Sequence, residues 1–357
     1  MASGELDRVE ESSGKGIPVW GYALGGPKVG SGPGASVKGA LWVSLPRAGE
    51  RVETLVLSVG VFVDPDVKPP LSWKLVVDGV SVSREFRPQF VAETDSGVYL
   101  KAVYDVKPIL ATKVVRQESH KILVFRDAVH PIRIADVFLY SRFASEKASY
   151  SVSYWTGAVA LEPGDLYKVD ANIGRGFGGK RVAGVVVHAP YHDSQFEVIA
   201  GGSRVERVMG QGVHYVEVGI PYRGSPIPVS VRYVNPGYRF FPRIGLVSEV
   251  VVRELRAPAP EPKLVVDKVE TVGDRVRVKG YVENVGDDTL GSTMLVVLAL
   301  GARLARRTLP PLKPGSRVDF DVEFDVSRLP VRPSRASLRL IWRRLGETRL
   351  IAEDISI

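Results

Sequence analysis

Apolar residues recur at every second position over many short segments of the chain. The clearest case is residues 318–324, where Val318, Phe320, Val322 and Phe324 alternate with charged residues. Further β-rich segments at 40–45, 98–104 and 132–140 are bounded by Gly, Pro or Asp. Alternation at a period of two is typical of β-strands with one buried face. Long runs of Ala, Leu, Glu and Lys at helical spacing are missing. The pattern therefore predicts an all-β protein built from β-sandwiches.

Two segments show the pattern of tight β-hairpins. Residues 73–77 and 80–83 flank Asp78-Gly79, and residues 196–200 and 205–208 flank Gly201-Gly202. A dipeptide that tolerates positive φ between two β-rich runs is a strong hairpin signal.

The surroundings of the two hairpins recur in a similar order. Residues 97–100 resemble 212–215, residues 131–140 resemble 242–252, and residues 45–49 resemble 161–164. This order predicts a diverged tandem duplication of one sandwich. The alternative is that two unrelated Val-rich sandwiches share turn chemistry.

The 357 residues are enough for two or three domains. The polar segment 1–16 is expected to be a disordered lead-in. Sandwiches are expected over 17–146 and 147–256, and the Pro-rich segment 257–262 is expected to be an extended linker. The last domain then spans 263–357, so the prediction is three sandwiches in series.

Residues from Lys263 to about Arg349 carry a family resemblance. The features are Asn284-Val-Gly286 at the end of one apolar run and a Pro-Gly turn at Pro314-Gly315 before the alternating residues 318–324. In this respect the segment resembles the CARDB family, the cell-adhesion-related domains of immunoglobulin-like fold. The resemblance implies a seven-stranded sandwich that serves as a spacer or binding module, often on secreted or surface proteins. It implies no catalysis.

Composition narrows the function classes. The formal charge is +8, but basic and acidic residues are interleaved along the chain, which argues against dedicated nucleic-acid binding, because concentrated basic patches carry that affinity. There is no cysteine, so disulfides and thiolate chemistry are excluded. Abundant charge with few Asn and Gln resembles proteins from hot environments. No signal peptide or membrane span is visible in the chain, so a surface location rests on the predicted architecture alone.

His188, His192 and Asp193 form the best candidate metal site, with His214 expected nearby on a partner strand. Zinc needs three or four converging donors, whereas Pro190 places this group at the exit of a strand. A polar loop is therefore the favoured interpretation. The pairs Asp64 and Asp66, and Asp287 and Asp288, could offer oxygen ligands to calcium, but turn formation explains them as well, and no cofactor is predicted.

Aromatic residues and Arg beside Gly and Pro suit contact surfaces for proteins or sugar rings. The candidates in the middle domain are Trp155, Tyr191, Tyr222, Arg223 and Tyr238. The first hypothesis is a non-enzymatic structural or interaction protein, such as a subunit of a filament, envelope layer or adhesion assembly, with protein partners or copies of itself. The second is a carbohydrate-binding accessory protein that uses these aromatics. The third is a metal- or carboxylate-dependent hydrolase, although no catalytic motif is present.

Overall fold

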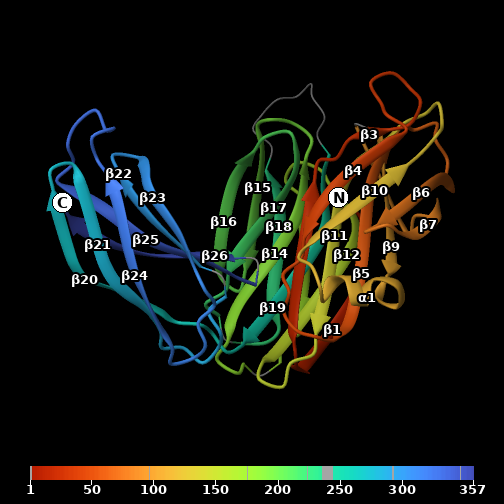
Figure 1. Ribbon diagram of the computed structural model, residues 1–357. Coiled ribbons are helices and arrows are strands. Elements are labelled where there is room, and N and C mark those ends of the chain that lie inside the picture. Colours follow the sequence, from red (N-terminus) through yellow and green to blue (C-terminus); the bar gives the residue numbers. More distant parts are fainter. Residues whose placement is uncertain are drawn as a thin grey trace. The chain divides into compact units, whose positions relative to one another are not determined.

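The computed structural model describes residues 2–95, 97–174, 176–222, 224–234, 244–291, 293–345 and 347–357. These residues form two compact units, Met1–Ala257 and Pro258–Ile357 (Figure 1). The protein is 66% strand and 2% helix, which confirms the all-β prediction. The helix in the described part, α1 (Lys107–Val114), is short, and the described helical structure includes nothing long and apolar enough to cross a membrane.

The first sandwich consists of two sheets that we name by their place in the unit. The first inner sheet has the order β2-β11-β5-β9-β8, with β3 paired to β11, and the first outer sheet has the order β4-β10-β6-β7. The strands of the inner sheet are β2 (Ile17–Leu24), β3 (Lys28–Val29), β5 (Val52–Val63), β8 (Phe90–Thr94), β9 (Gly97–Asp105) and β11 (Ile132–Phe143). Those of the outer sheet are β4 (Lys38–Ser44), β6 (Leu71–Val77), β7 (Val80–Phe86) and β10 (Ser119–Phe125).

The second sandwich is built in the same way. The second inner sheet has the order β1-β12-β19-β14-β17, and the second outer sheet has the order β13-β18-β15-β16. The inner strands are β1 (Ser3–Lys15), β12 (Ser149–Leu161), β14 (Lys180–Ala189), β17 (Gly212–Gly219) and β19 (Gly245–Arg256). The outer strands are β13 (Leu166–Ala171), β15 (Ser194–Ala200), β16 (Ser203–Met209) and β18 (Ile227–Val234).

The two sandwiches share one strand order. If β1, β3 and β8 are set aside, each sandwich has eight described strands, which can be numbered 1 to 8 along the chain. In both sandwiches the strand order is then 1-8-3-6 in the inner sheet and 2-7-4-5 in the outer sheet. This arrangement of two interlocked Greek keys is the jelly roll. The shared order supports the predicted duplication, which itself stays a prediction.

The equivalence also tests the individual sequence matches. The two hairpins are β6–β7 and β15–β16, which are equivalent, as are β9 and β17. Asp78 and Gly79 both have positive φ, at 48° and 84°, so the turn uses the conformation that the dipeptide predicts. The match of 45–49 with 161–164 is wrong, because the first segment joins β4 to β5 and the second joins β12 to β13.

The polar N-terminal segment is a strand, which corrects the prediction of a disordered lead-in. β1 pairs antiparallel with β12 from Ser3 to Lys15 and so belongs to the second sandwich, although it precedes the first. Its charged side chains made the segment look like a solvated tail. They are instead compatible with an edge strand, where backbone pairing supplies the stability and charge blocks further pairing.

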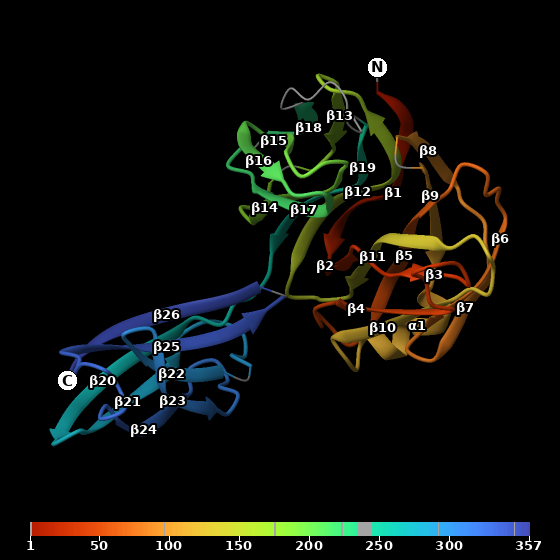
Figure 2. The same cartoon turned by 90° about the horizontal axis from the view of Figure 1, so that it is seen from above.

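The two jelly rolls pack through their inner sheets, so the seam between them is part of the interior of one compact unit. Figure 2 shows β1, β12, β2 and β11 between the two outer sheets. Tyr154 on β12 stacks on Phe138 and Tyr140 of β11, with ring centroids 5.6 and 4.9 Å apart. Because the inner sheets are covered on both faces, β11, β12, β14 and β19 are buried almost continuously.

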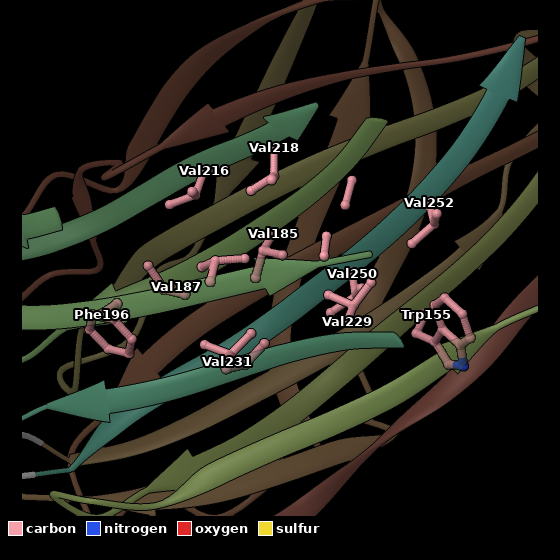
Figure 3. Close-up of a cluster of buried hydrophobic side chains, with 14 of the residues drawn as sticks. Trp155, Val185, Val187, Phe196, Val216, Val218, Val229, Val231, Val250 and Val252 are labelled. Atoms are coloured by element: carbon pink, nitrogen blue, oxygen red, sulfur yellow. The ribbon is translucent and has the colours of Figure 1, made fainter. Parts of the chain in front are cut away.

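The second jelly roll has its own Val-rich core between its inner and outer sheets (Figure 3). Val185, Val187, Val250 and Val252 of the inner sheet meet Val229, Val231 and Phe196 of the outer sheet in this core. β-Branched side chains at alternate positions fill such an inter-sheet layer well.

The unit Pro258–Ile357 is a third sandwich, with sheets ordered β20-β21-β24 and β23-β22-β25-β26. Val276, Val278 and Leu338 are among the residues of its core. The strands are β20 (Pro262–Val272), β21 (Arg275–Asn284), β22 (Thr293–Ala299), β23 (Ala302–Leu309), β24 (Arg317–Asp325), β25 (Arg335–Arg344) and β26 (Glu347–Ser356).

Asn284 and Gly286, which carry the family resemblance, lie at the start of this domain, and neither has positive φ. The buried Asn284 side chain accepts from the amides of Glu261 and Gly286 and donates to the carbonyls of Asp288 and Leu312. A Cβ on Gly286 would lie 2.2 Å from the Ala259 carbonyl oxygen. The motif therefore fixes the start of this domain by side-chain hydrogen bonds and close backbone approach.

Candidate functional site

Charged side chains lie buried in the seam between the two jelly rolls. Lys101 on β9 contacts Asp136 on β11 at 3.0 Å and Glu249 on β19 at 2.5 Å. All three are at most 1% exposed. Lys101 and Asp136 come from the first jelly roll and Glu249 from the second, so the ammonium group joins the two inner sheets. We call Lys101, Asp136, Glu249 and His188 the seam cluster.

Neutral polar groups complete the seam cluster. Tyr99 Oη donates to Asp136 Oδ2 at 2.6 Å, and Ser58 Oγ donates to Glu249 Oε1 at 2.5 Å. Lys101 Nζ also donates to the carbonyl of Ser248 at 3.1 Å. Buried charges need this kind of pairing, because an isolated ion would lose its hydration without compensation.

A glycine provides the space for this arrangement. A Cβ on Gly60 of β5 would lie 2.1 Å from Tyr99 Oη and 2.4 Å from Asp136 Oδ2. The register between β5 and β11 shifts between Ile134 and Asp136, and such a bulge re-aims the side chains that follow it. Local backbone irregularity and the missing side chain together admit the carboxylate.

His188, on β14, connects the seam cluster to a pocket. Its Nε2 lies 3.2 Å from Asp136 Oδ2 and 3.0 Å from Ser248 Oγ. Its Nδ1 is buried and makes no hydrogen bond in the described residues. The ring also packs edge-on against Tyr99 and Phe62.

Burial and charge shift the titration of the seam cluster in different directions. Burial lowers the pKa of His188, with the Asp136 carboxylate opposing it. Burial alone would raise the pKa of Asp136, but Lys101 and His188 bring that pKa below its usual value. Burial raises the pKa of Glu249, and Lys101 offsets only part of this rise. His188 is therefore neutral at pH 7, and with its Nε2–H directed to Asp136, Nδ1 is a hydrogen-bond acceptor.

The pocket opens at one end of the seam and has a volume of about 110 Å³. Both jelly rolls contribute to its wall, which includes Phe62, Thr94, Arg133, His188, Gln211 and Ile244. The Arg133 guanidinium lies over the Phe62 ring, 4.9 Å from its centroid. We call this cavity the seam pocket.

A second hollow adjoins the seam pocket. It shares Phe62, Arg133 and Gln211 with the pocket and adds Lys28 and Asp64. The wall of the seam pocket itself is mainly apolar with a few polar groups, which is the usual make-up of a small-molecule site, whereas the wall of the adjoining hollow is mainly polar.

The aromatic residues expected to form a binding surface are not gathered in this way. Trp155 is 7% exposed and lies in the core of the second jelly roll (Figure 3), so its ring cannot stack on a ligand. Tyr222 is 45% exposed, and half-buried Tyr191 packs against His192. Arg223 and Tyr238 lie outside the described residues.

The metal candidates separate in the structure. His188 points into the seam, whereas His192 is exposed and contacts Asp193 at 3.2 Å. His214 contacts the Gly210 carbonyl oxygen at 2.5 Å. In the described ranges no three His, Asp or Glu side chains come together as metal ligands. Pro190 ends β14 between the two histidines, which explains why they do not converge.

The calcium candidates serve as turn residues. The Asp64 carbonyl accepts from the amide of Val67. The carboxylates of Asp287 and Asp288 accept from the amides of Ala259 and Thr289, at 2.6 and 2.8 Å.

Sequence reasoning missed Lys101, Asp136 and Glu249. Each is a charged residue inside a long apolar run, within the sequences YLKAV, RIADVF and LVSEVVV. A charge at such a position either is an outward residue of a half-buried strand or has a partner in the interior. The continuous apolar flanks favour the second interpretation, but they do not identify the partner.

No family model and no curated protein sequence matches the chain. Among solved structures, it is similar to a Parabacteroides merdae β-glucuronidase, with 10% identity and a TM-score of 0.24 over 57% of this chain and 27% of that one. A Ruminococcus gnavus β-glucuronidase has 13% identity and a TM-score of 0.21, over 57% of this chain and 37% of that one. An Eisenbergiella tayi GH2 β-galacturonidase has 12% identity and a TM-score of 0.21, over 56% of this chain and 35% of that one. The chain thus spans about a quarter to a third of the length of these proteins.

The prediction of a non-enzymatic protein is contradicted by this comparison, because these three proteins are enzymes. The hypothesis of a structural subunit finds no support there, and the carbohydrate-binding alternative agrees better with the matches. At TM-scores of this size the likeness carries no residue-level correspondence.

Proposed function

We propose that the unit of the two jelly rolls binds a saccharide in the seam pocket. The observation that carries the proposal is the buried Nδ1 of His188, which has no hydrogen-bond partner in the described residues and belongs to a side chain that lines the seam pocket. A buried polar atom without a partner costs on the order of 1–3 kcal/mol, so a ligand hydroxyl that donates to it would bind favourably.

The other groups of the wall fit the same ligand class. A sugar ring has an apolar face of C–H groups, which can pack against Phe62, and a rim of hydroxyls. Arg133 and Gln211 can hydrogen-bond such a rim. The aromatic contact is thus proposed at the seam between the jelly rolls and not at the middle-domain aromatics considered from the sequence.

The test is calorimetric titration of the full chain with neutral and acidic monosaccharides and disaccharides. We expect at least one to bind, and Gln211→Ala and Arg133→Ala to weaken it about tenfold, which corresponds to about 1.4 kcal/mol. Arg116→Ala is the matched control, since Arg116 is exposed and does not line the seam pocket. Equal binding by wild type and both pocket variants, or no binding to any saccharide, would contradict the proposal.

Hydrolysis of the bound saccharide is a second candidate, favoured by the contact of His188 with Asp136. A carboxylate that holds one nitrogen of a histidine leaves the other free to take a proton. Here His188 Nδ1 would accept a proton from an attacking water, and Asp136 would stabilise the resulting imidazolium. The test uses 4-nitrophenyl glycosides, because their 4-nitrophenolate leaves without needing a proton. The rate of hydrolysis should then fall at acidic pH, where His188 is protonated, and be lost in the variant His188→Gln. A rate unchanged by that substitution excludes this role.

A further inference from the structure

The outer face of the first outer sheet carries an unusual set of exposed side chains. Trp42 on β4 is 59% exposed. Its strand alternates buried and exposed residues, so Lys38, Ala40 and Trp42 share the outward face. On β10, Lys121 lies opposite Trp42 and Phe125 lies opposite Lys38, which places them on the same face.

Three ammonium groups lie over the two aromatic rings of this face. Lys121 Nζ is 5.5 Å from the Trp42 ring centroid, and Lys38 and Lys74 Nζ are 5.4 and 6.0 Å from that of Phe125. Cation–π contacts of this length hold the lysine stems along the sheet. We call Lys38, Trp42, Lys74, Lys121 and Phe125 the lysine–aromatic face.

The charge of this face is of one sign. The outward residues of β4, β10 and β6 include no Asp or Glu, and within the described structure no carboxylate pairs with the three ammonium groups. Two acids border the sheet, and both have other partners: Glu85 on the edge strand β7, opposite Ser72, pairs with Arg87 at 2.7 Å, and the Asp78 carboxylate accepts from the backbone amide of Lys121 at 2.8 Å and contacts His120 at 2.7 Å. Unlike the interleaved charges of the rest of the chain, this cluster would attract an anionic partner.

We propose that the lysine–aromatic face binds an acidic polysaccharide. Sugar rings would pack on the Trp42 indole, and the carboxylate or sulfate groups of successive residues would pair with the three lysines. The surface follows the strands of a sheet, so it suits an extended polymer, whereas the seam pocket suits a single small ligand. The proposal is independent of that pocket.

The type of cation favours a polysaccharide over a nucleic acid. Arginine outnumbers lysine in the chain, yet the outward residues of β4, β10 and β6 include three lysines and no arginine. Arginine forks bind phosphates in two-point contacts and stack on bases, while lysine acts as a hydrated point charge. A face of lysines alone therefore matches charges spaced along a flexible glycan.

The experiment is affinity electrophoresis of the full chain in gels that contain polygalacturonate, with dextran as the neutral polymer and an oligothymidylate as the competing polyanion. We expect retention by polygalacturonate alone, weakened at least tenfold in Trp42→Ala and in the triple variant Lys38→Gln, Lys74→Gln, Lys121→Gln. Raising the salt from about 0.05 M to about 0.5 M should also release the polymer.

The matched control is the triple variant Lys107→Gln, Lys113→Gln, Lys147→Gln, which changes the net charge equally at exposed positions elsewhere in the same unit. Equal weakening by both triple variants, or no retention of the wild type, would overturn the proposal. Tighter binding of the oligothymidylate through the same residues would assign the face to nucleic acid instead. Binding of small saccharides in the seam pocket is measured separately by calorimetry. A protein that loses polygalacturonate retention but keeps its calorimetric binding, or the reverse, therefore distinguishes the two proposals.

Discussion

At the scale of single residues, Lys101 lies between two carboxylates that come from different jelly rolls. Removing it would leave Asp136 and Glu249 buried without their counter-charge. Breaking a buried pair on one side typically costs about 3–5 kcal/mol. We expect Lys101→Met to lower the free energy of unfolding of the two-jelly-roll unit by about that amount in urea titrations.

Lys107→Met is the matched control, because Lys107 is exposed at the start of α1, and we expect it to leave the unfolding free energy unchanged. A Lys101→Met protein as stable as the wild type would mean that the seam does not depend on this charge.

His188 predicts a pH dependence with a definite sign. Its folded-state pKa is lowered, chiefly by burial, so the unfolded chain takes up the proton first. Stability should therefore fall as the pH drops below the unfolded value of about 6.5, at up to about 1.4 kcal/mol per pH unit. Glu249, whose pKa is raised, acts in the opposite direction in mildly acidic solution.

The measurement is the difference in unfolding free energy between wild type and His188→Asn from pH 7 to pH 5. Glu249 is present in both proteins, so its opposing effect largely cancels from that difference. We expect the wild type to lose more stability on acidification than the variant. Parallel curves of unfolding free energy against pH would show that the pKa of His188 is the same in the folded and unfolded states.

At the scale of elements, the inner strands show what the sequence could and could not reveal. The turn dipeptides Asp78-Gly79 and Gly201-Gly202 between β-rich runs identified the hairpins β6–β7 and β15–β16. The outer strand β4 alternates buried and exposed residues, because its sheet has one exposed face. β12 and β14 lack this alternation, since both faces are buried. Continuous apolar runs indicate burial on two sides but do not say which sheet provides the cover.

Strand β1 was misjudged for the opposite reason, since its sequence is mostly polar and Leu6 alone among its described residues is buried in the core. What holds it is backbone pairing with β12, and Gly157 allows the close approach. A Cβ at Gly157 would lie 2.3 Å from the Glu5 carbonyl oxygen and 2.8 Å from the Leu6 Cα.

We therefore expect Gly157→Ala to displace β1 and to lower stability by about 1–3 kcal/mol. Amide exchange of residues 3–15 should become faster in this variant. Gly219→Ala, on β17 of the same inner sheet, is the control, because a Cβ there meets nothing within 4 Å. Unchanged exchange in β1 would show that the strand does not depend on this contact.

At the scale of the whole molecule, the all-β class and the division after the second sandwich follow from turn residues and the Pro-rich segment near Pro258. The seam between the jelly rolls could not be predicted from either of these features. Asp136 and Glu249 are far apart along the chain, and only the packing of two complete jelly rolls brings them to one lysine. Such a site has no local motif, which is why the sequence offered His188 as a metal ligand and left its carboxylate partner unseen.

The central claim is that the seam between the jelly rolls is a saccharide site. The most direct measurement is a crystal structure of the full chain grown with the saccharide that binds best in calorimetry. The account predicts a sugar ring against Phe62, with one hydroxyl within hydrogen-bond distance of His188 Nδ1. An empty seam pocket with the sugar bound at another surface would contradict it.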